Sequence, residues 1–229
     1  MKWSSRVRNL IGGGKTSPLT QALQSYPPLQ LPHAEDPLAL TETQTEENLE
    51  VWLQLIPERI DALRYLLSQA TNNIDWPENF PHGEPSFAII AAVHQWASQD
   101  WSDVAAVTQS ISEKPWRNAR RDGSCIAFSM TADIAIVIGE VIRAGRPSWS
   151  WGIDRDPANI NDQMGTVNRI VLISHWIGDA EKQVEIDVEE IVAQTFVKSP
   201  QQSWFVEDNW SRLASECLSG AHEGAGLHD

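Results

Sequence analysis

Residues 124–156 constrain what this chain can fold into more than any other part of the sequence. They read SCIAFSMTADIAIVIGEVIRAGRPSWSWGIDRD, the most apolar and most clearly delimited stretch of the chain. The apolar residues recur at spacings of three and four, which predicts one long, buried helix. Ser124 suits the N-cap, Gly145 suits a left-handed residue at the end, and Pro147 prevents the helix from continuing.

Two acids interrupt this apolar helix. Asp133 and Glu140 are seven residues apart, so they lie on nearly the same side of it. The simpler interpretation is a polar strip that meets water or a basic partner. The alternative is a pair of acids in a cleft, although two turns separate them and the sequence places no third group nearby. The acids also predict no stable membrane insertion, which takes about 20 uninterrupted apolar residues.

The segments around this helix predict the fold class. Trp149, Trp151 and Ile153 alternate and share one face of a strand, and residues 167–174 (VNRIVLIS) predict a second strand. Residues 43–70 and 85–99 have helical periodicity, with Pro57 expected to kink the first helix or begin a new one. The prediction is an α+β protein with a mainly helical first half and a long central helix packed on a small antiparallel sheet.

Three segments follow from composition along the chain. Residues 1–43 are predicted to be a basic N-terminus and a proline-rich arm, residues 44–218 a single α+β domain, and residues 219–229 a flexible tail. For the arm, an extended linker and a tail laid over the domain remain alternatives. Residues 1–15 contain four basic residues and no acid. Their apolar residues Trp3, Val7, Leu10 and Ile11 are spaced to share a helical face.

The net charge of −14 argues against nucleic acid as a partner and predicts attraction to a basic protein. Acids are concentrated in residues 179–229, where eleven of them face three Lys or Arg residues. The two cysteines, Cys125 and Cys217, indicate no disulfide framework and favour the cytoplasm. HExxH, CxxC and GxSxG motifs are absent, so we predict no metal site and no cofactor and assign no catalytic residue. The oligomeric state is left open.

The candidate binding residues lie around the end of the central helix and the strand after it. They are Glu140, Trp149, Trp151, Asp154, Asp156 and His175. His175 is expected to line a pocket at the end of the sheet together with Asp154 and Asp156. The two tryptophans are side chains of the kind that binds sugar rings, although packing in the core is the simpler interpretation.

Short pieces of residues 50–175 recur in the order found in a known type of protein. The pieces are Pro57-Glu58-Arg59-Ile60 with Leu63, Ile74-Asp75, Pro85-Ser86-Phe87, Trp96, Ile138-Gly139-Glu140-Val141-Ile142, residues 147–152, and Val171-Leu172. In this order the chain resembles uncharacterised bacterial proteins that carry a domain of unknown function. The resemblance implies an arrangement of elements and no catalytic residues. Independently of it, Gly139 allows another element to approach the helix, and Glu140 is placed to cap or to pair with Arg143.

These observations lead to a function prediction and its alternatives. We expect a non-enzymatic, acidic, cytoplasmic binding protein of bacterial origin, of the immunity or accessory type. The alternative is a hydrolase of unfamiliar type that uses Glu140, Asp154 and Asp156. A glycan-binding protein that uses Trp149 and Trp151 is a weaker third hypothesis.

Overall fold

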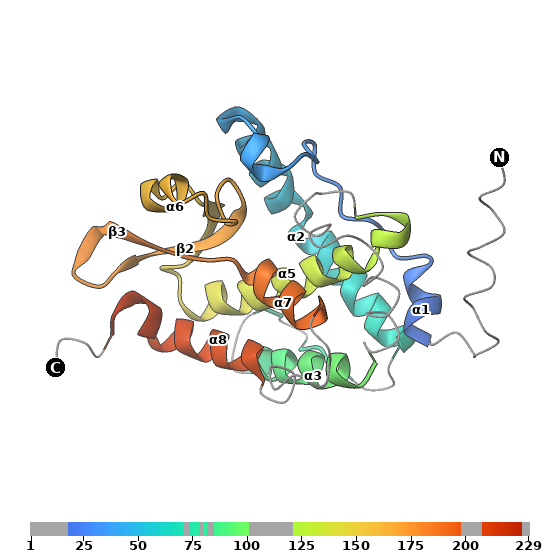
Figure 1. The fold of residues 1–229 in the computed structure, drawn as a ribbon. Coiled ribbons are helices and arrows are strands. Elements are labelled where there is room, and N and C mark those ends of the chain that lie inside the picture. The colour runs from blue at the N-terminus through green and yellow to red at the C-terminus, as the bar shows by residue number, and fades with distance from the viewer. Residues whose placement is uncertain are drawn as a thin grey trace, which may run out of the picture.

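A computed structural model describes residues 18–70, 74–77, 80–81, 85–100, 121–197 and 208–225. In this part the chain is an α+β protein, in which a group of helices carries a small antiparallel sheet at one side (Figure 1). The elements are α1 (Pro18–Leu23), the 3-10 helix η1 (Pro37–Ala39), α2 (Glu42–Ala70), α3 (Pro85–Asp100), η2 (Gly123–Cys125), α5 (Ala127–Gly145), β1 (Ser150–Ile153), α6 (Pro157–Asn161), β2 (Ile170–Trp176), β3 (Asp179–Ile186), α7 (Val188–Val197), α8 (Asn209–Ser219) and η4 (Ala221–Glu223). The predicted fold class is confirmed.

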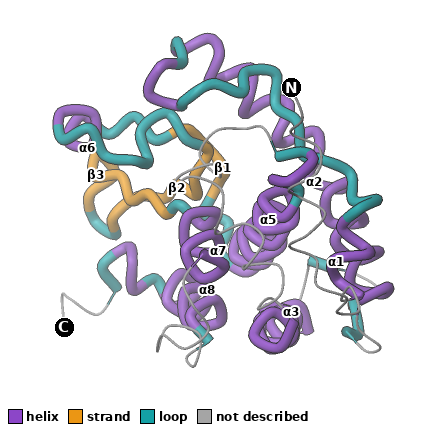
Figure 2. The backbone as a smooth tube through the Cα atoms, turned by 45° about the vertical axis from the view of Figure 1, so that its right-hand side comes forward, coloured by secondary structure: helices purple, strands orange, loops and turns teal. Residues whose placement is uncertain are grey.

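Helix α5 is the centre of the core, as its apolar sequence predicts. Fifteen of its 19 residues are buried. Helices α2, α3, α7 and α8 all contact it, and Figure 2 shows α5 between α2 on one side and α7 with α8 on the other. Within the described residues, no helix has the length and apolar character that crossing a membrane takes.

The ends of α5 differ from the prediction. Ser124 lies in the 3-10 turn η2, and Ile126 stands at the N-cap without a capping side chain. The last helical residue is Gly145, and the C-cap Arg146 has an extended backbone, so no left-handed glycine caps the helix. Gly145 is instead needed for packing, because a Cβ there would lie 2.5 Å from Leu218 of α8.

The sheet has the order β1-β2-β3, with both neighbouring pairs antiparallel. Trp151 of β1 pairs with Leu172 of β2, and Ile173 of β2 pairs with Glu185 of β3. The sequence predicted β1 and β2 to within three residues at each end but not β3, whose first four residues are exposed. The sheet packs on α5 through Trp151, because a Cβ on Gly139 would lie only 2.2 Å from its ring.

The proline-rich segment is part of the domain and not an extended arm. Leu19, Leu23, Tyr26 and Leu29 are all buried in the same core as α2 and α5. The Leu29 amide donates to the Ser129 hydroxyl of α5 at 2.8 Å. Of the two alternatives for this segment, the chain laid over the domain is the one observed. The predicted helical face of residues 1–15 lies outside the described residues.

The first part of the predicted C-terminal tail is also packed. Glu223 is buried at 2% exposure, forms an ion pair with Arg146, and accepts a hydrogen bond from Ser174 of β2 at 2.5 Å. The Ile177 amide donates to the Glu223 carbonyl at 2.7 Å. The expectation of a flexible tail from residue 219 is therefore wrong for residues 219–225. This segment follows α8 and forms hydrogen bonds with the sheet.

Candidate functional site

A buried cluster, which we call the Asp133 cluster, joins the N-terminal segment to the core. It consists of Tyr26, Arg59 and Asp133. Arg59 of α2 donates to both oxygens of the fully buried Asp133 carboxylate, from Nε at 2.8 Å and from Nη2 at 2.6 Å. The Tyr26 hydroxyl donates to the same carboxylate, and Arg59 Nη2 also donates to the Pro27 carbonyl at 2.9 Å. Asp133 is thus buried and paired, which corrects the prediction of a polar strip that meets water.

Burial and pairing act in opposite directions on this cluster. Burial raises the pKa of Asp133 to about 6, although the hydrogen bonds and charge of Arg59 lower it. The pKa of Tyr26 is raised by burial and by the adjacent carboxylate. Because every oxygen of Asp133 has a donor, the cluster has the features of a structural link between segments.

A second buried group, the Arg169 cluster, contains Arg121, Arg169, Asp187 and Glu189. Arg169 Nε lies 2.5 Å from Asp187 and Nη2 lies 3.3 Å from Glu189, while Arg121 lies 2.7 Å from Glu189. All four side chains are at most 8% exposed, so these two acids are not part of a surface that attracts a partner. The adjacent hollow has a volume of about 40 Å³, far smaller than the grooves described below.

The structure places Glu140 against β1. Its Oε1 accepts from the Trp151 indole at 2.8 Å and from Arg143 at 2.6 Å. The expected pairing with Arg143 and the close approach at Gly139 are thus both observed. Trp151 is 7% exposed and meets Trp52 edge-on with centroids 5.5 Å apart. Trp149 is 2% exposed, so neither ring offers a face to a sugar.

Asp154 and Asp156 organise the loop after β1. The Asp154 carboxylate is fully buried and accepts from the Asp156 amide at 3.0 Å and from the Asn159 amide group at 3.0 and 3.2 Å. Asp156 is the N-cap of α6 and accepts from the Ala158 amide at 2.6 Å. Burial, then the charges of Asp154 and Asp156, raise the pKa of the nearby Glu185. Across the described ranges, no three His, Cys, Asp or Glu side chains are placed to hold a metal ion.

His175 is not near this loop. Ile153, next to Asp154, pairs with Ile170 at the start of β2, whereas His175 is exposed near the end of that strand. Five residues of strand correspond to roughly 17 Å. The predicted pocket of His175 with Asp154 and Asp156 is therefore wrong. Glu140 and Asp154 also line none of three pockets that lie within the described residues, which are the hollow beside Arg169 and two grooves between helices.

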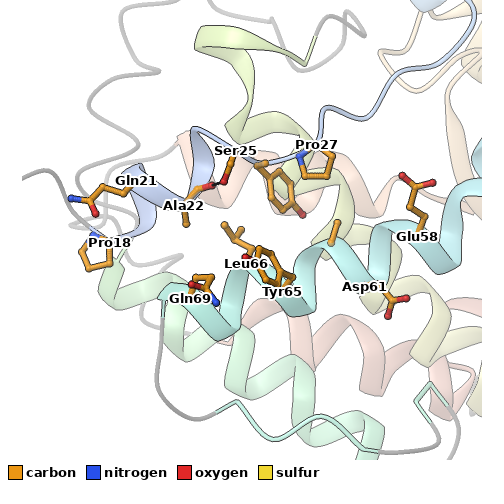
Figure 3. A pocket seen from close by; sticks show the side chains of 12 residues that line it. Pro18, Gln21, Ala22, Ser25, Pro27, Glu58, Asp61, Tyr65, Leu66 and Gln69 are labelled. Carbon is orange, nitrogen blue, oxygen red and sulfur yellow. Dashed lines mark hydrogen bonds between the residues drawn. The ribbon is translucent and has the colours of Figure 1, made fainter.

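The largest of these three pockets is a groove between α1 and α2, which we call the α1–α2 groove. It has a volume of about 510 Å³ and is open to solvent along one side (Figure 3). Most of its lining is apolar or aromatic, and this part is formed by Pro18, Ala22, Tyr26, Pro27, Ala62, Tyr65 and Leu66. Gln21, Ser25 and Gln69 add neutral polar groups. Tyr26 belongs to both the groove and the Asp133 cluster.

Acids mark one end of the groove, and an exposed aromatic ring lies between its two ends. Glu58 and Asp61 lie toward the Pro27 end, while Pro18 and Gln69 lie at the other (Figure 3). Glu58 is exposed and forms no ion pair with a described residue. Asp61 is 73% exposed and lies 3.6 Å from Arg64, a surface pair of the kind that contributes under about 1 kcal/mol. The Tyr65 ring is 66% exposed.

Another groove, between α7 and α8, is smaller and already internally paired. Its volume is about 250 Å³. Of its lining residues, Glu216 lies 3.2 Å from His222 and 3.9 Å from Arg212. Its charges therefore have ion-pair partners within the fold, whereas Glu58 in the α1–α2 groove forms no ion pair with a described residue.

Sequence reasoning missed the α1–α2 groove because it missed α1. The signal was present, since Leu19, Leu23, Tyr26 and Leu29 recur at intervals of three and four. The surrounding prolines indicated an extended segment instead. Without α1, nothing marked Glu58, Asp61 and Tyr65 as different from any other exposed face of a helix.

No family model, no curated protein and no solved structure matches this chain. The resemblance to bacterial proteins with a domain of unknown function therefore stays a prediction, and the function has to be argued from the geometry of the chain itself.

Proposed function

We propose that this chain is a non-enzymatic binding protein whose α1–α2 groove takes a basic, amphipathic segment of a protein partner. The observation that carries the proposal is the combination of an apolar floor with exposed carboxylates at one end. An apolar residue of the partner would cover the partly exposed Ala22 and Ala62, and a Lys or Arg would meet Glu58 and Asp61. The exposed Tyr65 ring offers a guanidinium a stacking face.

The whole chain supports a cationic partner. A net charge of −14 speeds the encounter with a positively charged protein, and groove contacts then hold the complex. An immunity or accessory role in a bacterial cytoplasm is the biological setting that we propose. Its basis is the charge and the two unpaired cysteines, Cys125 and Cys217.

The hydrolase alternative has less support. It requires Glu140, Asp154 and Asp156 to act on one substrate. Glu140 is engaged by Trp151 and Arg143, and Asp154 is fully buried with its donors in place. No specific geometry favours a reaction among these residues.

The test is partner capture with matched variants. The full chain is immobilised and exposed to lysate of the cell that makes it, at low salt and at about 0.15 M salt, where the Debye length is about 8 Å. We expect a cationic protein to be retained by the wild type and lost by Glu58→Gln/Asp61→Asn. The control Glu50→Gln/Glu181→Gln makes the same charge change outside the groove and should retain it. If the groove variant and the control retain the same proteins, the groove is not the binding site.

A further inference from the structure

The α1–α2 groove begins where the described chain begins. Pro18, the first residue of α1, lines the end of the groove opposite the acids (Figure 3). Residues 1–17 are therefore attached at the mouth of the groove. Any affinity of these residues for the groove acts within one chain and needs no encounter between molecules.

The sequence of residues 1–17 has the chemistry that the groove complements. It contains Lys2, Arg6, Arg8 and Lys15 and no acid. Trp3, Val7, Leu10 and Ile11 are spaced to form one face of a short helix. The groove offers the matching arrangement, with an apolar floor around Leu66 and two exposed carboxylates, Glu58 and Asp61.

The lengths also match. Gln69 and Glu58, at opposite ends of the groove, are eleven residues apart on α2, or about 16 Å along its axis. Residues 2–11 would span about 15 Å as a helix. Between them and Pro18 stand Gly12, Gly13 and Gly14, which lack a Cβ and permit a sharp reversal of the chain. A segment that turns back there would bring its arginines toward the acidic end.

We infer that residues 1–17 of this chain occupy its own α1–α2 groove and compete there with a partner. A linker of six residues has a root-mean-square length of roughly 13 Å, and such short linkers give effective concentrations in the mM range. A segment with a Kd of about 1 mM would then fill the groove half of the time. The inference rests on the proposed function for its regulatory meaning, since the competitor is the partner segment proposed above.

The experiment detects where Lys2 lies in the full chain. Equal amounts of ¹⁴N- and ¹⁵N-labelled protein are mixed, and a carbodiimide couples lysine amines to nearby carboxylates. Mass spectrometry of the digest then identifies the coupled pairs and whether both halves come from one chain. We expect Lys2 coupled to Glu58 or Asp61 within one chain. Lys15 is uninformative because it is only three residues from Pro18.

Matched variants separate docking from chance proximity. Arg6→Gln/Arg8→Gln keeps Lys2 but removes two charges, and it should lower the yield of the Lys2 link several-fold. The control Lys182→Gln/Arg212→Gln removes two charges from β3 and α8, and it should leave the yield unchanged. Equal coupling of Lys2 to Glu50, which is on α2 outside the groove, would overturn the inference. So would the absence of the Lys2 links. Lys2 links of which about half join a ¹⁴N to a ¹⁵N peptide would also overturn it, because equal mixing gives that fraction when a second copy is the occupant.

Failure of this inference is distinguishable from failure of the proposed function. If Lys2 couples in the groove but no partner is captured there, the segment docks and the proposed function is wrong. If a partner is captured through the groove but Lys2 does not couple, the proposed function stands and the docking of residues 1–17 is wrong. If both occur, the captured partner should lower the Lys2 link, and Arg6→Gln/Arg8→Gln should tighten partner binding by up to about twofold, as follows from a groove that is filled half of the time.

Discussion

The end of the sheet at β1 and the α1–α2 groove both combine acids with aromatic rings, but they use them differently. Around β1, Glu140 accepts from Trp151 at 2.8 Å, and Asp154 accepts from Asn159 at 3.0 Å with no exposed surface. In the groove, Glu58 and Asp61 face solvent next to an exposed Tyr65. In the first region the acids accept hydrogen bonds from donors within the fold. In the second region the acids are exposed and available to a binding partner.

This difference separates stability from binding. A buried acid that accepts hydrogen bonds from its neighbours stabilises the fold, and its removal leaves those donors without an acceptor. An exposed acid beside an apolar floor contributes little to the fold and remains free to meet a cation. The residue types alone do not distinguish the two regions, because both contain acids near aromatic rings. Variants that change stability in one region and binding in the other therefore test the comparison.

The largest effect is expected for Arg59→Met, which acts beneath the groove. It leaves Asp133 fully buried without its charge partner and should cost about 3–5 kcal/mol of unfolding free energy, measured by urea denaturation. The control Arg64→Met lies on the same helix with an exposed partner, Asp61, and should cost under about 1 kcal/mol. Arg59→Met/Asp133→Leu should recover most of the loss. A double variant as unstable as Arg59→Met would show that the ion pair is not the cause.

The pH dependence of the same cluster gives the next effect. The pKa of Asp133 is raised by burial to about 6, above the ordinary value near 4 in the unfolded chain. The stabilisation from this group is therefore complete below about pH 4 and lost as the pH rises through about 6. Relative to Asp133→Asn, which does not titrate, the wild type should lose on the order of 2–3 kcal/mol of unfolding free energy between pH 4 and 7. A gain over that range would mean that Arg59 outweighs burial.

In the β1 region, Asp154→Ala should cost about 2–3 kcal/mol. The substitution leaves the Asn159 amide group and the Asp156 amide without their acceptor in a buried site. Asp156→Ala removes only the N-cap of the short helix α6 and should cost about 1 kcal/mol. Thermal unfolding of both variants checks the order. If both variants lose the same small amount of stability, Asp154 is not a structural acid and could act on a ligand. That result would contradict the contrast between the β1 region and the groove.

Gly139→Ala tests the contact between the central helix and the sheet. The new Cβ would lie 2.2 Å from Cζ2 of Trp151, whose indole is held by Glu140. Overpacking of about 1–3 kcal/mol should exceed the gain of about 1 kcal/mol in helix propensity, which leaves a net loss of about 1 kcal/mol. In a Trp151→Phe background the ring is smaller, so the same substitution should be neutral or stabilising. Additive losses in the double variant would mean that the close approach is not what requires glycine.

The sequence predicted the elements whose burial is local and continuous. Helix α5 and strands β1 and β2 are apolar runs, so their pattern alone identifies them. Strand β3 was missed because it is an exposed edge whose first residues are Asp, Ala, Glu and Lys. Helix α1 was missed because prolines indicated an extended segment, although Leu19 and Leu23 are core residues.

The site was harder to predict than the fold, because it depends on pairings between distant residues. Asp133 appeared to be a surface acid until Arg59, 74 residues away, was seen to pair with it. Asp187 and Glu189 appeared to be part of an acidic surface, but both are buried and form ion pairs with Arg169 and Arg121. A sequence lists polar groups but does not say which already have partners, and that distinction separates the β1 region from the groove.

The smallest effect on stability is expected at the rim of the groove itself. Glu58→Gln/Asp61→Asn changes two exposed side chains and breaks only the surface pair of Asp61 with Arg64. The free energy of unfolding should therefore change by no more than about 0.5 kcal/mol, as for surface substitutions in general, and the melting temperature should match that of Glu50→Gln/Glu181→Gln. Partner capture, in contrast, should be lost in the groove variant alone. If the groove variant instead loses as much stability as Asp154→Ala, Glu58 and Asp61 are structural acids, and the two regions do not differ in the way proposed.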